Sequence, residues 1–154
     1  MTRVDSSLGT LLRTLIDALD GDLERAYAQA GLDFRPRFTP VVRLLAAKGA
    51  LRIKDLASCM GLSHSAVSQT VGQLVAQGWV RLEPGADGRE RVARLTPRAL
   101  AALPELQRCW AATARAADAL DAELGLDLEE VVRRAVAALQ RQSFLARIAE
   151  ADAS

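Results

Sequence analysis

The chain has 154 residues, enough for one domain that buries a core without disulfides or metals. Half of the residues are hydrophobic and a quarter are charged, which excludes a disordered chain. The 20 basic and 19 acidic residues nearly balance, so the protein is not a uniformly basic nucleic-acid coat, although a local basic patch fits this charge. Alanine (29) and leucine (24) dominate, which favours a mostly helical fold.

Residues 6–30 are expected to form a long amphipathic helix, because leucines recur there at steps of three and four residues. Ser6 or Ser7 is suited to cap its start, and Gly31 to end it. The apolar stripe is longer than the core of one small lobe needs. Part of it is therefore expected to face a second subunit.

A helix-turn-helix is predicted in the middle of the chain. After a loop at 31–38, Thr39-Pro40 begins a short helix, with Thr as cap and Pro in the first turn. Residues 51–53 are expected to form a brief strand. Two helices follow at 54–61 and 63–77, and the glycine-containing turn between them is typical of a helix-turn-helix.

The hydrophobic period then changes. Alternating segments at 79–82 and 89–95 flank a turn rich in Gly and Pro, which predicts a β-hairpin. Thr96-Pro97 begins a long helix, which Pro104 is expected to kink or break. Asp127 is expected to cap one last helix that continues to near the C-terminus.

This order of elements is that of a winged helix, and its second helix and hairpin are candidates for binding double-stranded DNA. The start of the second helix offers short, uncharged polar side chains suited to base edges in a major groove: Ser63, His64, Ser65, Ser68 and Gln69. Residues 81–98 hold five arginines against three acidic residues, so positive charge gathers on and beside the hairpin. We expect the helix to read bases and the wing to contact phosphates or the minor groove.

Three segments together resemble the MarR family of winged helix-turn-helix transcriptional regulators. They are Leu62-Ser63 through Gly78-Trp79-Val80, the wing sequence Asp87-Gly88-Arg89-Glu90-Arg91, and Leu95-Thr96-Pro97. The resemblance extends over essentially the whole chain. It implies a mostly α fold with a small β-hairpin wing, in a single domain spanning residues 1–154.

The resemblance also implies how this domain is divided. Residues 38–98 would form the DNA-binding lobe, and helices within 6–34 and 104–150 would intertwine into a homodimer. Arg89 would enter the minor groove, Asp87 would steady the wing, and Arg91 completes the wing site. Many relatives carry a basic residue where this chain has Gln69, so the operator preference does not carry over.

By the same resemblance, the protein would repress transcription by occupying a pseudo-palindromic operator, with activation left open. A small-molecule effector that favours another quaternary arrangement would release the DNA. Four aromatic residues are weak candidates for the ligand cleft, with a place in the core as the commoner role: Tyr27, Phe34, Phe38 and Trp110.

Two other functions compete with DNA binding. Winged helices also serve as protein-interaction scaffolds. A thiol-based redox switch is the second alternative, through Cys59 or Cys109, although buried or incidental cysteines are favoured.

Enzyme activity is not expected. No recognisable nucleophile arrangement or phosphate-binding loop is present. One histidine and two scattered cysteines are a poor supply of metal ligands, so neither a metal nor a cofactor is predicted.

A cytoplasmic location without membrane insertion is predicted. Charged residues interrupt the first helical stretch, unlike the apolar core of a signal peptide. The uncharged run from Leu56 to Val80 carries too many polar side chains to span a bilayer. Two cysteines 50 residues apart fit a reducing compartment.

Overall fold

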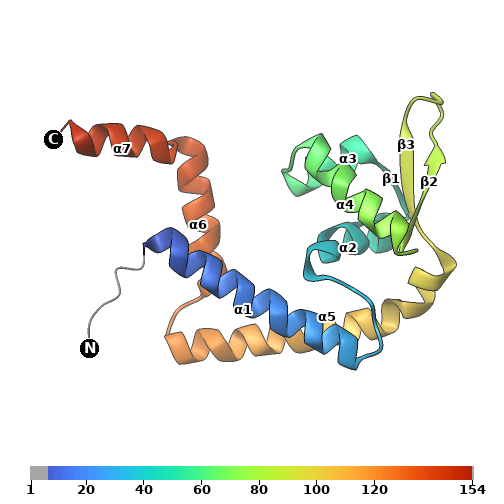
Figure 1. Cartoon of the computed structure of the whole chain (residues 1–154), viewed down its shortest axis with the longest axis horizontal. Coiled ribbons are helices and arrows are strands. Elements are labelled where there is room, and N and C mark those ends of the chain that lie inside the picture. The colour runs from blue at the N-terminus through green and yellow to red at the C-terminus, as the bar shows by residue number, and fades with distance from the viewer. Residues whose placement is uncertain (1–6, 154) are drawn as a thin grey trace. The chain divides into compact units, whose positions relative to one another are not determined.

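The computed structural model describes residues 7–153, and in them it places seven α-helices, one short 3-10 helix and a three-stranded antiparallel sheet (Figure 1). The predicted fold class, mostly helical with a small β-hairpin wing, is confirmed. Two compact units divide the chain after Trp110.

The first unit begins with α1 (Leu8–Gln29). The Ser7 hydroxyl accepts a hydrogen bond from the Thr10 amide at 3.3 Å, so Ser7 is its N-cap, and Ser6 lies outside the described residues. A 3-10 turn, η1 (Pro36–Phe38), lies in the predicted loop and leads directly into α2 (Thr39–Lys48). Thr39 is therefore the first residue of α2 and not its cap, because η1 continues into the helix.

The helix-turn-helix has the predicted form. The brief strand is β1 (Ala50–Arg52), and the two helices are α3 (Ile53–Met60) and α4 (His64–Ala76). Gly61 adopts φ +63° after α3, a left-handed conformation that glycine takes without steric cost. Ser63 caps α4, since its hydroxyl accepts from the Ala66 amide at 3.2 Å.

The wing is formed by β2 (Val80–Pro84) and β3 (Arg91–Leu95), joined by the expected turn. The strand order is β1-β3-β2, so the brief strand completes the sheet by pairing with β3, with Arg52 opposite Val92. This pairing places the start of α3 next to the turn end of the wing.

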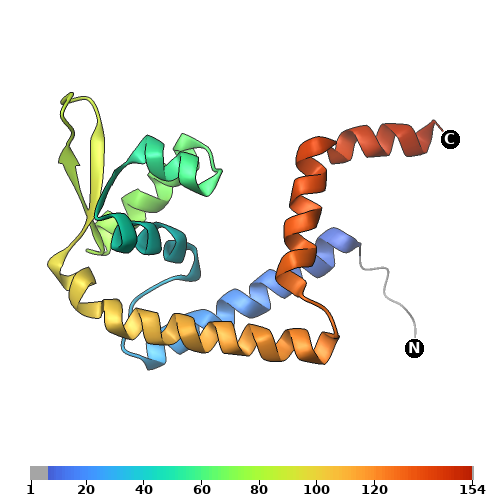
Figure 2. The ribbon, with the colours of Figure 1, turned by 180° about the vertical axis from the view of Figure 1, so that it is seen from behind.

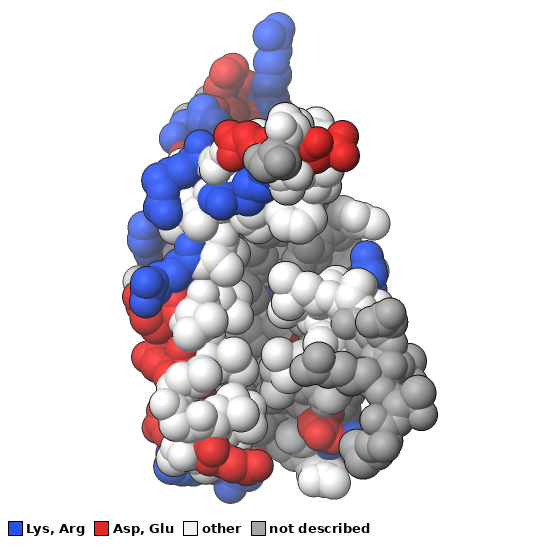
Figure 3. Space-filling view, turned by 90° about the vertical axis from the view of Figure 1, so that its left-hand side faces the viewer, with Lys and Arg blue, Asp and Glu red and all other residues white. Residues whose placement is uncertain are grey.

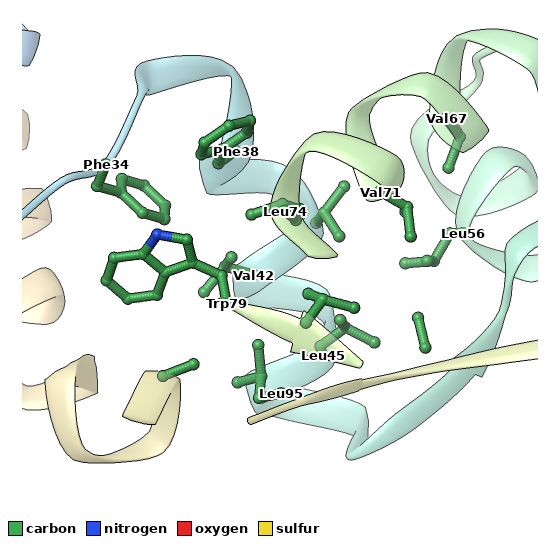
Figure 4. Close-up of a cluster of buried hydrophobic side chains, with 14 of the residues drawn as sticks. Phe34, Phe38, Val42, Leu45, Leu56, Val67, Val71, Leu74, Trp79 and Leu95 are labelled. Carbon is green, nitrogen blue, oxygen red and sulfur yellow. The ribbon is translucent and has the colours of Figure 1, made fainter. Parts of the chain in front are cut away.

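The core of the first unit lies between α2, α3, α4 and the sheet. The buried side chains of α4 point toward those of α2 and α3, and Trp79 meets Phe34 at the edge of the cluster (Figure 4). Val67, Val71 and Leu74 of α4 are completely buried. Because one face of α4 is buried in this way, its opposite face is exposed to solvent.

The helix α5 (Pro97–Leu124) follows the wing and is one unbroken ribbon in Figure 2. Of the kink or break expected at Pro104, the break does not occur. Proline removes the hydrogen bond to the carbonyl four residues earlier, on Leu100, and that residue is exposed, so water can replace the bond. Thr96 caps the helix as expected, because its hydroxyl accepts from the Ala99 amide at 3.1 Å.

The second unit ends in two helices where the sequence pattern predicted one. They are α6 (Leu128–Arg141) and α7 (Phe144–Asp152). Asp127 caps α6 as expected, accepting from the Glu130 amide at 2.7 Å. Gln142 is extended, and the Ser143 hydroxyl accepts from the Ala146 amide at 3.2 Å, so a second N-cap begins α7. The apolar pattern continues across this break and concealed it.

Neither α6 nor α7 buries a side chain, although both are amphipathic. Their large apolar residues are exposed, as are those in the first half of α1: Leu8, Leu11, Leu12, Ile16, Leu19, Val131, Val132, Val136, Leu139, Phe144, Leu145 and Ile148. Among the described helices, none is long and apolar enough to cross a membrane.

Candidate nucleic-acid interface

The exposed face of α4 carries the polar side chains that the sequence singled out. Ser63, His64, Ser65 and Gln69 are exposed, and Ser68 is half-buried. His64 Nδ1 and Ser68 Oγ lie 3.3 Å apart and form a hydrogen bond. No charged residue occurs in α4, so this face presents donors and acceptors without a net charge.

A pocket of about 320 Å³ lies between this face and the wing. It brings together two α4 residues, His64 and Ser68, and two wing residues, Arg89 and Arg91. The sequence assigned these four residues to one interface without showing that they meet. Ser65, Gln69 and Asp87 do not line the pocket.

The arginines of the wing fall into two groups. Arg81 and Arg94 both pair with Glu83, at 3.2 and 2.9 Å. Arg89 and Arg91 are exposed, and within residues 7–153 neither forms an ion pair. The positive charge that remains available on the wing is therefore concentrated at Arg89 and Arg91, the two cations beside α4.

Glu90 connects the wing to the helix-turn-helix. Its carboxylate lies 2.6 Å from Lys54 Nζ and 3.3 Å from Arg52 Nη1, and Arg52 also binds Asp55 at 2.7 Å. The hydrogen bond from Lys54 and the nearby Arg52 charge lower the pKa of Glu90. The hydrogen bond from Arg52 likewise lowers the pKa of Asp55.

Asp87, which the resemblance assigned to steadying the wing, lies at the exposed tip. Its backbone carbonyl accepts from the Arg89 amide, and its carboxylate has no hydrogen bond or ion pair within the described part of the chain.

Arg52, Lys54 and Glu90 were not singled out in the sequence. The only available signal was the Arg52–Asp55 spacing at the start of a helix, because the contacts with Glu90 span 36 residues or more.

The four candidate cleft aromatics are buried in the first unit. Tyr27, Phe34 and Phe38 make edge-to-face contacts, and Trp110 Nε1 donates to the Tyr27 hydroxyl at 3.1 Å. These contacts are those of a packed core with satisfied polar groups.

The two cysteines differ in exposure. Cys59 is exposed, with Lys48 Nζ 3.9 Å from its sulfur, and Cys109 is partly buried. In the described residues, no group of three or more His, Cys, Asp or Glu could hold a metal ion.

Residues 39–90, which include the helix-turn-helix and most of the wing, match the model of the MarR family. This segment, 52 of the 154 residues, is similar to the MarR family. The resemblance inferred from the sequence is confirmed. Members of this family are transcriptional regulators and not enzymes, in agreement with the expected function class.

Solved structures with the same fold match almost the whole chain. The Mycobacterium tuberculosis regulator MOSR in complex with DNA is 21% identical, with a TM-score of 0.66, covering 94% of this chain and 97% of MOSR. The Streptomyces coelicolor regulator PcaV with its natural ligand is 22% identical, with a TM-score of 0.65, covering 93% and 99%. A mutant of Escherichia coli MarR with operator DNA is 19% identical, with a TM-score of 0.59, covering 88% and 93%. No curated protein matches the chain significantly by sequence.

Proposed function

We propose that this protein is a homodimeric, sequence-specific DNA-binding regulator that represses transcription by occupying a pseudo-palindromic operator. One observation carries the proposal. An uncharged polar helix face lies beside a wing on which Arg89 and Arg91 have no acidic partner in the described residues. Such a surface offers hydrogen bonds to bases and positive charge to the backbone, the two components of DNA recognition.

The two parts have different roles. The exposed residues of α4 read base edges in the major groove, where Gln69 can form two hydrogen bonds with adenine. Arg89, at the glycine-containing tip, enters the minor groove, and Arg91 contacts a phosphate. The DNA complexes of MOSR and of the Escherichia coli MarR mutant contain this fold bound to DNA, which supports the assignment.

The second requirement is a dimer, and helices within 6–34 and 104–150 supply it. The apolar residues of α1, α6 and α7 are exposed in the single chain, and a second copy would remove them from water. On the side of the molecule in Figure 3, uncharged side chains cover much of the middle, and charged side chains of both signs lie along the left-hand border. A two-fold dimer sets its recognition helices about 34–36 Å apart, one turn of the duplex.

A small-molecule effector would relieve repression by binding another arrangement of the dimer more tightly than the DNA-bound one. The complex of PcaV with its natural ligand supports this part of the proposal. Tyr27, Phe34, Phe38 and Trp110 stay candidates for the ligand cleft, and opening one there would require them to separate. The protein acts in the cytoplasm, where its DNA is.

Selection of bound duplexes from a random pool tests this function. The wild-type protein is expected to enrich an inverted repeat, because each protomer reads one half-site. Enrichment of sequences without two-fold symmetry would contradict the dimeric operator complex. Absence of enrichment, even at low salt, would contradict DNA recognition.

Replacement of Arg89 by alanine tests the wing. We expect Arg89→Ala to weaken operator binding by about 1–3 kcal/mol and to make the dependence on salt shallower, since it removes a cation next to the duplex. Arg81→Ala is the matched control, because Arg81 lies on the same wing but is already paired with Glu83. Equal losses in the two variants, measured by fluorescence anisotropy at several salt concentrations, would contradict the special role of Arg89.

A further inference from the structure

Glu90 is an acidic residue in the middle of the basic part of the interface. It lies between Arg89 and Arg91 in the sequence, and its side chain is about one quarter exposed. A carboxylate on a surface that faces phosphates repels them, so its presence there weakens DNA binding through charge alone. We therefore expect Glu90 to make another contribution to DNA binding that outweighs this repulsion.

The contacts of Glu90 provide that contribution. Its carboxylate bridges Lys54 in the first turn of α3 and Arg52 at the end of β1, with distances of 2.6 and 3.3–3.4 Å. Arg52 is in turn held by two hydrogen bonds to Asp55, at 2.7 and 3.1 Å. Glu90 thus joins the turn end of the wing to the first helix of the helix-turn-helix.

The backbone around Glu90 is anchored as well. The Gly85 amide donates to the Glu90 carbonyl at 2.8 Å and closes the wing turn. A Cβ atom on Gly85 would lie 3.0 Å from the Glu90 Cβ, so the glycine leaves room for the Glu90 side chain. The exposed tip, residues 86–89, is therefore attached to the unit through this pair of residues.

Glu83, the acidic residue on β2, forms ion pairs with different partners. It pairs with Arg81 and Arg94, which lie opposite each other on β2 and β3. Its ion pairs stay inside the hairpin, whereas those of Glu90 leave it. The two carboxylates carry the same charge, but only Glu90 determines where the hairpin lies relative to α3.

We propose that Glu90 is a positioning residue for DNA binding, which fixes the wing against α3 by bridging Lys54 and Arg52 and so holds Arg89 and Arg91 beside α4. This inference rests on the DNA-binding function proposed above. It assigns the steadying role to the residue that closes the wing turn and not to the exposed Asp87. Loss of Glu90 removes a repulsive charge and also frees the wing, and the second effect is the larger.

Comparison of Glu90→Gln with Glu83→Gln tests the proposal, because each variant removes one negative charge from the wing. The probes are the duplex that the wild-type protein selects and a mixed-sequence duplex of equal length. We expect Glu83→Gln to bind the selected duplex as tightly as the wild type or more tightly. Glu90→Gln is expected to bind it roughly three- to tenfold more weakly and to discriminate less between the two duplexes.

Amide hydrogen exchange of the free, full-length protein provides a readout that does not depend on DNA. Exchange over residues 86–91 is expected to accelerate in Glu90→Gln and to stay at the wild-type rate in Glu83→Gln. Equal exchange in the two variants, or tighter binding by both, would overturn the role of Glu90. Failure of the wild type to select any duplex would instead overturn the proposed function, while the exchange data would still decide whether Glu90 holds the wing.

Discussion

The winged-helix region and the terminal helices use the same residue types and reach opposite results. In the winged helix, the apolar faces of α2, α3, α4 and the sheet cover one another, so Val67, Val71 and Leu74 are completely buried. In α6 and α7 no side chain is buried, although the apolar stripe is equally clear. The uncovered apolar surface of the terminal helices is the one that the proposed homodimer would bury.

The functional surfaces follow from this difference. Because the winged helix is complete by itself, its outer face is free to carry uncharged polar side chains and unpaired arginines. The apolar side chains of the terminal helices are exposed in the single chain. Their contribution to stability therefore depends on the proposed association of two chains. Four predictions test this contrast, from the largest expected effect to the smallest.

Truncation of an aromatic side chain should have a large effect in the winged helix. Trp79 is almost completely buried, and its Nε1 donates to the Asp33 carbonyl at 2.9 Å. We expect Trp79→Ala to lower the free energy of unfolding by about 3–5 kcal/mol, the usual cost of such a cavity. Phe144→Ala in α7 is the matched comparison, and in dilute protein it should change stability little because Phe144 is exposed. Similar losses in urea unfolding would show that α7 packs on a core of its own.

A charge in the apolar stripe of α6 should separate the protomers. Val132→Asp places a carboxylate in the proposed interface on both copies, and we expect the dissociation constant to rise more than about 100-fold, or about 3 kcal/mol. Arg134→Gln changes the net charge by the same amount, and its position lies on the polar side of the helix. Sedimentation of both variants checks the result. If Arg134→Gln dissociated the dimer as strongly as Val132→Asp does, the dimer interface would lie on another surface.

Removal of the Gln69 amide should change specificity more than affinity. Its side chain is exposed on α4 and can reach a base edge. We expect Gln69→Ala to alter the base preference at one position in each half-site, with discrimination there reduced by about 1–3 kcal/mol. Duplex selection by wild type and variant measures this. An unchanged selected sequence would exclude Gln69 from base reading.

The ion pairs of Glu90 with Lys54 and Arg52, and of Arg52 with Asp55, should make a small, pH-dependent contribution to the stability of the folded protein. The folded state lowers the pKa of Glu90 and Asp55 from ordinary values of 4.5 and 3.8. Their stabilisation is therefore fully present above those values and is lost as the pH falls through the lowered pKa. We expect the difference in Tm between wild type and Glu90→Gln to shrink as the pH falls from about 7 to about 3. A difference that stays constant would exclude an ionised Glu90 as its cause.

Much of the local structure could be predicted because its causes are local. Ser63, Thr96 and Asp127 are N-caps in the structure, as their short oxygen-bearing side chains and positions suggested. Two differences from the predicted elements also have local causes. Ser143 begins a second helix inside a continuous apolar pattern, and Pro104 lies where water can replace the lost hydrogen bond. Periodicity detects neither event.

By itself, the sequence determined the winged helix, its exposed polar residues and its basic wing, because helix periodicity, strand alternation and turn residues act over a few neighbours. Only the tertiary structure decided which arginines of the wing are paired with acidic residues and which stay available to bind a ligand. Pairing of β1 with β3 brings Lys54 and Arg52 to Glu90, and the hairpin register brings Arg81 and Arg94 to Glu83, which leaves Arg89 and Arg91 beside α4. Ion pairs across 36 or more residues follow from strand pairing, and no short-range pattern in the sequence encodes them.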